Sequence, residues 1–438
     1  MAGPPSRSEP VPGRWGRALS SLQAPQFRWL FASNVAFFLA MGSQGVVRAW
    51  LAFKLTGSEF ALGLVMFAVA VPMLFIAPIG GVVADRFERR NLIAAGQAVV
   101  LVSELVLLTL IATDRLEFRH LLTAAAVMGC VFPFIMPARQ AIVANIVGKR
   151  GLPNAMALNM AGMNTTRVLG PAAAGFLIEL VGVTWAYSFG VLLYATGLLC
   201  MVAVKASRPE PRERPLSVLG SIGEGMAYAR DHRVVLVLLL FGLLPMLLAM
   251  PFQNLLVVFA EEVWDVGSRG LGLLSAAAGM GGVIGSIWVA ARASASQRLT
   301  TMMLSMLAFS SILFAFSVSP WFLLALPLVL VANIFAAVFG TLNNTAIQLL
   351  IPDHVRGRIS SFLMMSFSLP LLGTLPMAAV AESRGAPFAV GLASVLAIGV
   401  AVLFYLVSPS LRDMDRSVKE ALALGETVPV EHANHRSR

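Results

Sequence analysis

The chain has 438 residues, of which 58% are hydrophobic and 12% are charged, and its formal net charge is +10. Soluble domains are about 45–50% apolar and about 25% charged, so this composition argues against a soluble enzyme or nucleic-acid-binding protein and for a membrane protein. The positive charge is better explained by Lys and Arg in cytoplasmic loops. The only two cysteines, Cys130 and Cys200, exclude a disulfide framework.

Twelve apolar segments follow one another along the chain, each long enough to cross a hydrocarbon core of about 30 Å as a helix. The first six are 28–53, 61–84, 92–113, 120–146, 156–180 and 184–205. The second six are 233–259, 269–291, 300–318, 321–350, 358–381 and 386–408. We therefore predict an all-α membrane protein with twelve transmembrane helices, flanked by polar tails at 1–25 and 409–438.

Residues 206–232 interrupt the apolar pattern in the middle of the chain, as a linker with a short amphipathic helix on the cytoplasmic surface would. This linker separates an N-terminal six-helix bundle at 26–205 from a C-terminal one at 233–408. The halves echo each other weakly, with Pro171 matching Pro376. Secondary transporters with parallel halves, related by a pseudo-two-fold axis along the membrane normal, bind substrate where the halves meet.

Lys and Arg are distributed unevenly between the two sides of the predicted membrane. One side holds both tails, the linker and the arginine-rich loops, whereas the opposite side holds only Lys54, Arg115, Arg119, Arg269 and Arg384. Because Lys and Arg accumulate in cytoplasmic loops, we predict that both termini are cytoplasmic.

The loop between the second and third spans reads GGVVADRFERR. It resembles the signature loop of the major facilitator superfamily through Gly81, Asp85, Arg86, Arg89 and Arg90. The glycine permits close helix approach, and the aspartate can accept hydrogen bonds from the free N–H groups of a helix N-terminus. The resemblance implies a latch between the halves that engages the eleventh helix when the cytoplasmic side is shut. The chain departs from the family pattern at Glu88, where glycine is usual, and an ordinary positively charged loop is the alternative.

Two further stretches, 137–179 and 259–285, resemble the group of this superfamily that contains the enterobactin exporter and macrolide efflux proteins. This resemblance implies a multi-pass protein of the bacterial cytoplasmic membrane that works as a drug–proton antiporter.

Within the predicted fifth span, Gly170 and Pro171 are followed by Gly175, which is similar to the antiporter signature of the superfamily. The match is partial, because Ala174 and Thr166 stand where the signature prefers glycine. A helix of this kind can kink and can pack closely against its neighbours. The resemblance implies export in exchange for protons, and a plain packing helix is the alternative.

Three ionisable side chains, Arg48, Glu104 and Arg167, lie inside predicted spans, where each costs about 2.5–3.5 kcal/mol on insertion scales. Glu104 and Arg167 are both about 18 Å from the cytoplasmic ends of their spans, so they can pair if their helices face each other. A carboxyl group balanced between burial and a nearby arginine suits proton coupling, and Gln97 continues a polar path on the same face. The alternative is a structural glutamate, permanently protonated or paired.

Arg139, near the inner end of the fourth span, is expected to snorkel to the cytoplasmic interface.

A polar stripe runs along the predicted first span, where Asn34, Gln44 and Arg48 fall within an arc of about 80° at 100° per residue. The family resemblance implies that spans one, four, seven and ten line the cavity, so the stripe is a candidate substrate path. A structural stripe is the alternative. The second half adds the uncharged polar candidates Gln253, Asn254 and Asn333.

The sequence contains no GxxxxGK[ST] phosphate-binding loop, and the GMGGVIG stretch at 279–285 lies within an apolar span, where helix packing explains its glycines. No metal-binding or nucleophile pattern is present. We therefore predict that the protein is not an enzyme and needs no cofactor or metal.

These observations predict a secondary active transporter, driven by the proton gradient, that exports a hydrophobic or amphipathic small molecule such as a drug, a macrolide or a siderophore-like compound. We expect a monomer among membrane lipids, with no nucleic-acid partner. The alternatives are a lipid or lysolipid flippase, a nutrient or siderophore importer on the same fold, or a non-transporting membrane scaffold.

Overall fold

The computed structural model describes residues 20–205, 227, 230–291, 298–350, 368–412 and 415. Within this part of the chain the secondary structure is entirely helical, which confirms the predicted fold class. Nine of the described helices are long and apolar enough to cross a membrane. The division into twelve spans stays a prediction, because the eleventh predicted span begins at residue 358, outside the described residues.

The N-terminal half begins with a short 3₁₀ helix and continues through long α-helices. These are η1 (Ser20–Gln23), α2 (Pro25–Thr56), α3 (Glu59–Arg86), α4 (Arg89–Ala112), α5 (Phe118–Val181) and α6 (Val183–Val202). α5 covers both the fourth and the fifth predicted spans and is interrupted at Gly148, where φ is +66°. Glycine reaches this left-handed region without steric cost, so one residue separates the two spans.

The C-terminal half contains shorter elements. These are α8 (Arg233–Leu248), η2 (Met250–Leu255), α9 (Leu256–Val258), η3 (Phe259–Val263), α10 (Gly267–Ala291), α11 (Arg298–Ser317), α12 (Phe322–Leu350), α14 (Leu369–Arg384), α15 (Ala386–Val407) and α16 (Pro409–Arg412).

The predicted seventh span, 233–259, is helical, but it is divided between α8, η2, α9 and the start of η3 and is not one continuous α-helix. After α8, the 3₁₀ helix η2 begins at Met250 with Pro251 beside it, and η3 has π-helical hydrogen bonding. Proline has no backbone N–H to donate to the preceding turn, so an α-helix cannot pass through it undisturbed. Non-α segments inside spans are frequent at functional sites.

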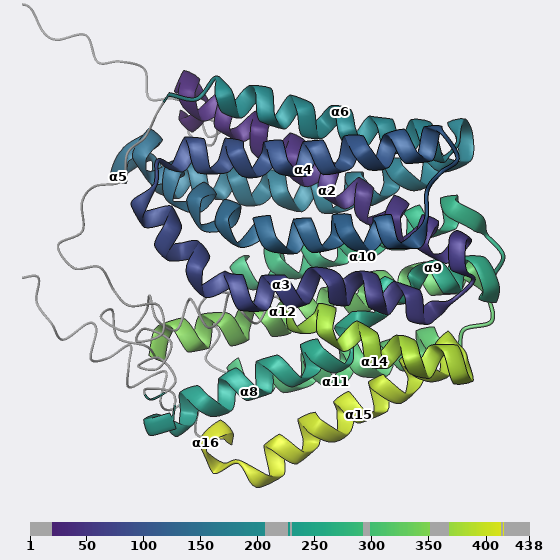
Figure 1. Ribbon diagram of the computed structural model, residues 1–438. Helices are drawn as coiled ribbons and strands as arrows, with labels where there is room; N and C mark the ends of the chain where they lie inside the picture. Colours follow the sequence, from purple (N-terminus) through teal and green to yellow (C-terminus); the bar gives the residue numbers. More distant parts are fainter. Residues whose placement is uncertain are drawn as a thin grey trace, which may run out of the picture.

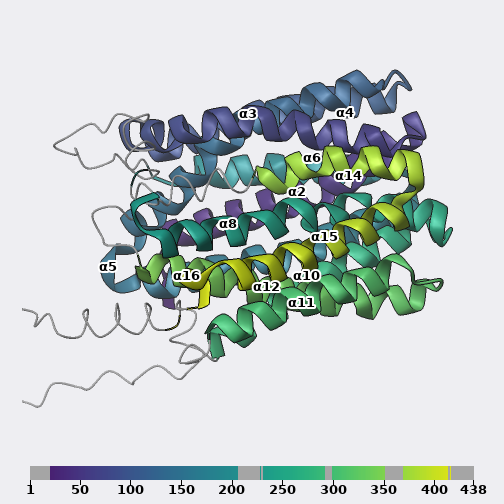
Figure 2. The ribbon, with the colours of Figure 1, turned by 90° about the horizontal axis from the view of Figure 1, so that it is seen from below.

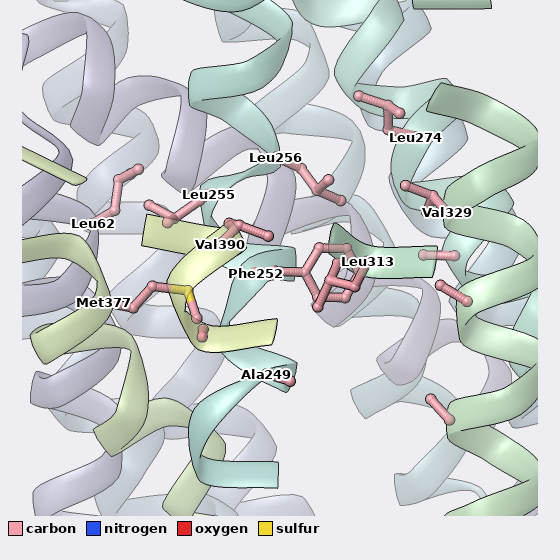
Figure 3. Close-up of a cluster of buried hydrophobic side chains, with 14 of the residues drawn as sticks. Leu62, Ala249, Phe252, Leu255, Leu256, Leu274, Leu313, Val329, Met377 and Val390 are labelled. Carbon is pink, nitrogen blue, oxygen red and sulfur yellow. The ribbon is translucent and has the colours of Figure 1, made fainter. Parts of the chain in front are cut away.

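The interrupted segment is anchored by its apolar side chains. Phe252 and Leu255 of η2 are fully buried, and they share one core with Leu62 of α3 and Val390 of α15 (Figure 3). The core therefore extends from one half of the molecule into the other.

The turn between α2 and α3 shows why these helices end where they do. Gly57 adopts φ +61° and donates its N–H to the carbonyl of Phe53 at 2.7 Å, which closes the last turn of α2. Ser58 then caps α3, because its Oγ accepts the N–H of Ala61 at 3.3 Å.

The two halves lie side by side, with α2, α4 and α6 on one side of the molecule and α8, α11 and α15 on the other (Figure 1). Two helix pairs join them: α3 packs along α14, as Figure 2 shows, and α5 packs along α10. Glycines permit the second contact. A Cβ on Gly175 of α5 would lie 2.6 Å from the Cα of Gly272, and a Cβ on Gly279 would lie 2.6 Å from the carbonyl oxygen of Arg167.

Candidate functional site

The most unusual group of side chains lies inside the N-terminal half, where Glu104 of α4 is 2% exposed. Its carboxylate forms an ion pair with Arg48 of α2, at 3.3 Å between Oε1 and Nη1. Both residues are eight positions from one end of their helices, Thr56 and Ala112, or about 12 Å along the axis. The two charges therefore lie at the same depth.

Arg167 does not pair with Glu104, so the expected ion pair between these two residues is not present. Its side chain is exposed on α5 and forms no hydrogen bond or ion pair with another described residue. Glu104 does pair with an arginine at its own depth, but that arginine is Arg48. The depth of a residue along its helix does not say which neighbouring helix its side chain faces. A role for Arg167 in proton coupling stays a prediction.

Tyr187 of α6 completes the site by donating its hydroxyl hydrogen bond to Glu104 Oε2. Gln44 of α2 donates from Nε2 to the carbonyl of Tyr187 at 2.9 Å. Arg48 in turn donates from Nε to the carbonyl of Gln44 at 3.3 Å. The four residues form one connected network, and both carboxylate oxygens of Glu104 have a partner.

A second group of polar contacts lies about two turns away along α4. Gln97 lies within 3.4 Å of the Ser33 hydroxyl, and Ser33 donates to the carbonyl of Gly197 at 2.7 Å. The Oε1 atoms of Gln44 and Gln97 and the Tyr194 hydroxyl are buried without a protein partner among the described residues. Gln97 and Glu104 lie seven residues apart on one face of α4, but no hydrogen bond among the described residues links their two groups, so the polar path stays a prediction.

The sequence reading missed the contribution of α6. A Cβ on Gly190 would lie 2.3 Å from Gln44 Nε2, and one on Gly197 would lie 3.4 Å from Gln97 Nε2. Tyr187 and Tyr194 are two of only four tyrosines in the chain, and they share a face with these glycines at helical spacing. This pattern of alternating Tyr and Gly was the signal that could have identified α6 as part of the site.

The ion pair joins three helices at one carboxylate. Removing two charges from water is expensive, and their attraction offsets this only with good geometry and additional hydrogen bonds. Here Arg48 of α2 and the Tyr187 hydroxyl of α6 supply a counter-ion and a hydrogen bond to Glu104 of α4, so the three helices meet at this group.

Arg139 is the second buried cation of this half, and it does not snorkel as expected. It is 3% exposed, donates to Asn34 Oδ1, and lies over the ring of Phe37 at 4.5 Å. The amide nitrogen of Asn34 donates to Asn159 Oδ1 at 2.9 Å. Asn34 of the predicted stripe therefore belongs to a different cluster from Gln44 and Arg48, which turn into the bundle.

In the C-terminal half, the three predicted substrate-path residues bind other helices. Gln253 is exposed and donates to Asn333 Oδ1 at 2.9 Å. Asn254 donates to the Thr374 hydroxyl at 2.8 Å. Gln253 and Asn254 both lie in η2, so the break in the seventh span positions them.

The structure places the predicted latch at the junction of α3 and α4. Gly81, Asp85 and Arg86 lie in the last turns of α3. Arg89 donates to Asn145 Oδ1 at 2.9 Å and Arg90 to the carbonyl of Val202 at 2.7 Å, so both bind within their own half. The expected contact with the start of the eleventh span lies outside the described residues, and so does the side chain of Asp85.

The predicted antiporter-type helix makes close contacts on two sides. A Cβ on Gly170 would lie 3.0 Å from the carbonyl oxygen of Leu39, and Pro171 lies against Gly42 of α2. Gly175, one turn further, faces α10 of the other half. Its role in antiport stays a prediction, but the small face is present.

Polar contacts join the halves at the end predicted to face outside. Lys54 of α2 forms an ion pair with Glu261. Glu382 of α14 accepts hydrogen bonds from the Ser58 hydroxyl at 2.9 Å and the Phe60 N–H at 3.1 Å. A cleft of about 740 Å³ lies beside these contacts, lined by residues of both halves that include Trp50, Glu179, Arg269 and Phe322.

Among the described residues, no group of three or more His, Cys, Asp or Glu side chains could hold a metal ion.

Comparisons with known proteins give a consistent result. A profile of the family described as transmembrane secretion effector matches residues 17–435. The enterobactin exporter EntS of Shigella boydii serotype 18 is 28% identical over 408 residues, which is 90% of this chain and 95% of that protein. The enterobactin exporter EntS of Escherichia coli O139:H28 is 27% identical with the same coverage.

Solved structures share the fold. The nucleoside transporter NupG superposes with a TM-score of 0.68 at 14% identity, over 87% of this chain and 98% of that one. A bacterial homologue of the human lysosomal transporter Spinster, in an inward-facing and unoccupied conformation, gives 0.64 at 13% identity, over 94% and 99% of the two chains.

Proposed function

Because this chain belongs to the transmembrane secretion effector family of the major facilitator superfamily, and is therefore a multi-pass membrane transporter, we propose that it is a proton-coupled exporter of a hydrophobic or amphipathic small molecule. Drugs, macrolides and siderophore-like compounds are the substrates to test. The protein is not an enzyme. We place it in the bacterial cytoplasmic membrane with both termini inside, as a monomer driven by the proton gradient without a cofactor.

The observation that carries the proposal is the ion pair between Arg48 and Glu104, with Tyr187 bound to the same carboxylate. A buried ionisable group within a span is expensive, and in transporters it commonly serves a proton relay. Each proton that moves down the membrane potential supplies about 2.3 kcal/mol per 100 mV. If Glu104 binds a proton in place of its ion pair with Arg48, the energy supplied by the membrane potential is converted into a change in helix packing.

Export of an amphipathic compound is favoured by two observations. Relatives named as enterobactin exporters align with 90% of the chain. The buried core is also largely apolar, and Gln253 and Asn333 are among the uncharged polar residues of the C-terminal half. Apolar linings with a few fixed polar groups suit ligands that combine both characters.

The contacts between halves support alternating access. At the predicted outer end, Lys54 with Glu261, and Glu382 with the start of α3, close the interface. Release to the outside would require these contacts to break, while the glycine-lined contact of α5 with α10 serves as a pivot. Rigid-body rocking of two halves about a central site is the general mechanism of such transporters.

The proposal is tested by transport in proteoliposomes under an imposed pH gradient, with a dye, a macrolide and a siderophore as compounds. We expect gradient-driven movement by the wild type and a loss of about tenfold or more in Glu104→Gln, which cannot exchange a proton. Glu117→Gln is the matched control, because Glu117 is exposed next to Arg119 in the predicted outer loop. It should transport like the wild type.

Full gradient-driven transport by Glu104→Gln would remove Glu104 from the mechanism. Absence of movement of every compound by folded wild type would contradict the proposal, and movement of a fluorescent lysolipid in the same vesicles would then identify a flippase.

A further inference from the structure

Arg139 has an uncompensated charge in the N-terminal half. No described carboxylate forms an ion pair with it, and its one hydrogen bond to a described residue goes to the neutral amide of Asn34. A guanidinium stays charged in proteins, and an unpaired buried charge is unfavourable. The residue lies nine positions before Gly148, about 14 Å along α5, which places it well inside the predicted span.

The unused atoms of Arg139 form one edge of its guanidinium. Nε and Nη2 are both buried without a protein partner among the described residues, whereas Nη1 binds Asn34. The Nε–H and one Nη2–H point in parallel, in the spacing that matches two oxygens of a carboxylate, sulfonate or phosphate. The free edge is thus the one suited to bidentate binding of an oxyanion.

The surroundings of this edge are aromatic. The guanidinium carbon lies 4.5 Å from the ring centre of Phe37 and 5.7 Å from that of Phe38. Aromatic faces stabilise a cation and also provide apolar surface for the body of a ligand. Phe37 is fully buried and Phe38 is nearly so, so a ligand would reach these rings only when the cluster opens, and an anion with an apolar or aromatic body would then find both of its parts matched.

A chain of amides connects the buried cation with accessible surface. Asn34 contacts Arg139 on one side and Asn159 of α5 on the other, and Asn159 is only partly buried. The next residue, Met160, is 56% exposed.

We propose that Arg139, with Asn34 and Asn159, is a binding site for the acidic group of an amphipathic organic anion, which reaches it when the contact between Asn34 and Asn159 opens. The inference rests on the proposed function and deepens it, because it names the class of substrate. It assigns anion recognition to Arg139 and leaves the proton to Glu104.

The test uses the full chain in phosphatidylcholine nanodiscs and two probes with the same skeleton. Anilinonaphthalenesulfonate carries a sulfonate, and N-phenylnaphthylamine carries no charge. Binding above that of protein-free nanodiscs is measured for wild type, Arg139→Gln and Arg139→Lys. We expect Arg139→Gln to bind the sulfonate more weakly by a factor of about ten or more, because a charge-assisted hydrogen bond is lost. Arg139→Lys keeps the positive charge but loses the two parallel N–H groups of the guanidinium, so its affinity for the sulfonate should be intermediate.

Binding of the neutral probe reports the fold and should be equal in all variants. Arg115→Gln is the control for charge, because Arg115 is exposed in the predicted outer loop and its replacement removes one positive charge away from the site. Equal sulfonate affinity in wild type and Arg139→Gln would overturn the proposal. An equal loss in Arg115→Gln would overturn it too, because the effect would then be one of net charge.

Adding phosphatidylglycerol distinguishes two sources of the anion. Competition with the sulfonate in wild type but not in Arg139→Gln would support the site and identify a lipid headgroup as its ligand. If phosphatidylglycerol does not compete with the sulfonate, while Arg139→Gln still binds the sulfonate more weakly than the wild type, the result would support a soluble amphipathic anion as the ligand. Because these measurements need no gradient, failure of proton-driven transport would contradict the proposed function and leave the binding result intact.

Discussion

Two arginines are buried in the same half of this transporter, and they differ in what faces them. Arg48 meets the carboxylate of Glu104, which also receives the Tyr187 hydroxyl. Arg139 meets one neutral amide and two aromatic rings, and one edge of its guanidinium is unused. The two sites therefore carry different proposals: a proton at the paired site of Arg48 and Glu104, and an anion at the unpaired edge of Arg139.

The largest expected effect comes from removing the cation of the paired site. Arg48→Gln should lower the free energy of unfolding by about 3–5 kcal/mol at neutral pH, because Glu104 is left buried and uncompensated. Denaturant or thermal unfolding of the purified chain in detergent measures this loss.

The double variant Arg48→Gln/Glu104→Gln is the control for this prediction. It should recover most of the lost stability, because no charge remains to be compensated. An equal loss in the single and double variants would mean that packing around Arg48, and not its charge, stabilises the bundle.

A smaller loss is expected from the tyrosine that completes the paired site. Tyr187→Phe removes a hydrogen bond to a charged group, which is worth about 1.5–3 kcal/mol. Tyr405→Phe is the matched control, because Tyr405 is exposed on α15. The same unfolding experiment should show the difference, and equal stabilities of the two variants would contradict the role assigned to the Tyr187 hydroxyl.

The amide chain beside Arg139 should contribute less than the ion pair. Asn159→Ala removes the acceptor of the Asn34 amide and should cost about 0.5–1.5 kcal/mol. Asn164→Ala, on the same helix, is the control, because no hydrogen bond of its side chain to another described residue is present. Anion binding measured as above should weaken in Asn159→Ala only, and an unchanged affinity would remove Asn159 from the site.

The smallest effect on stability is expected at Arg139 itself. Arg139→Gln should change the free energy of unfolding by no more than about 0.5 kcal/mol, or raise it, because a buried charge without a partner is removed. This outcome would separate the two arginines most clearly. If Arg139→Gln lowered the free energy of unfolding as much as Arg48→Gln does, Arg139 would be a structural cation. The proposed difference between the two arginines would then be contradicted.

The sequence predicted much of the fold because apolar length alone identifies helices in a membrane protein. The predicted span 61–84 lies inside α3, and the predicted span 92–113 nearly coincides with α4. The seventh span was an exception, because average hydropathy does not show where a helix changes its hydrogen bonding: α8 continues through Pro245, whereas the chain turns into the 3₁₀ helix η2 beside Pro251.

The candidate site was predicted only in part. Glu104, Arg48 and Gln44 were each recognised as costly polar groups in an apolar segment, which is a property of one residue and its neighbours along the chain. Their assignment to separate roles was not supported by the structure, since all three belong to one network. Tyr187 was missed, because a tyrosine near a helix end is common and its partner is on another helix.

By itself, the sequence determined that this chain is a helical membrane protein of a known transporter plan and that a few of its spans contain charges that need partners. Only the tertiary structure decided that Glu104 pairs with Arg48 and not with Arg167, and that no carboxylate of the described part of the chain pairs with Arg139. The physical reason is that hydropathy and residue count give the depth of a group along its helix. The rotation of that helix and its neighbours follow from packing, in which glycines such as Gly190 and Gly197 make room for side chains far away in the sequence.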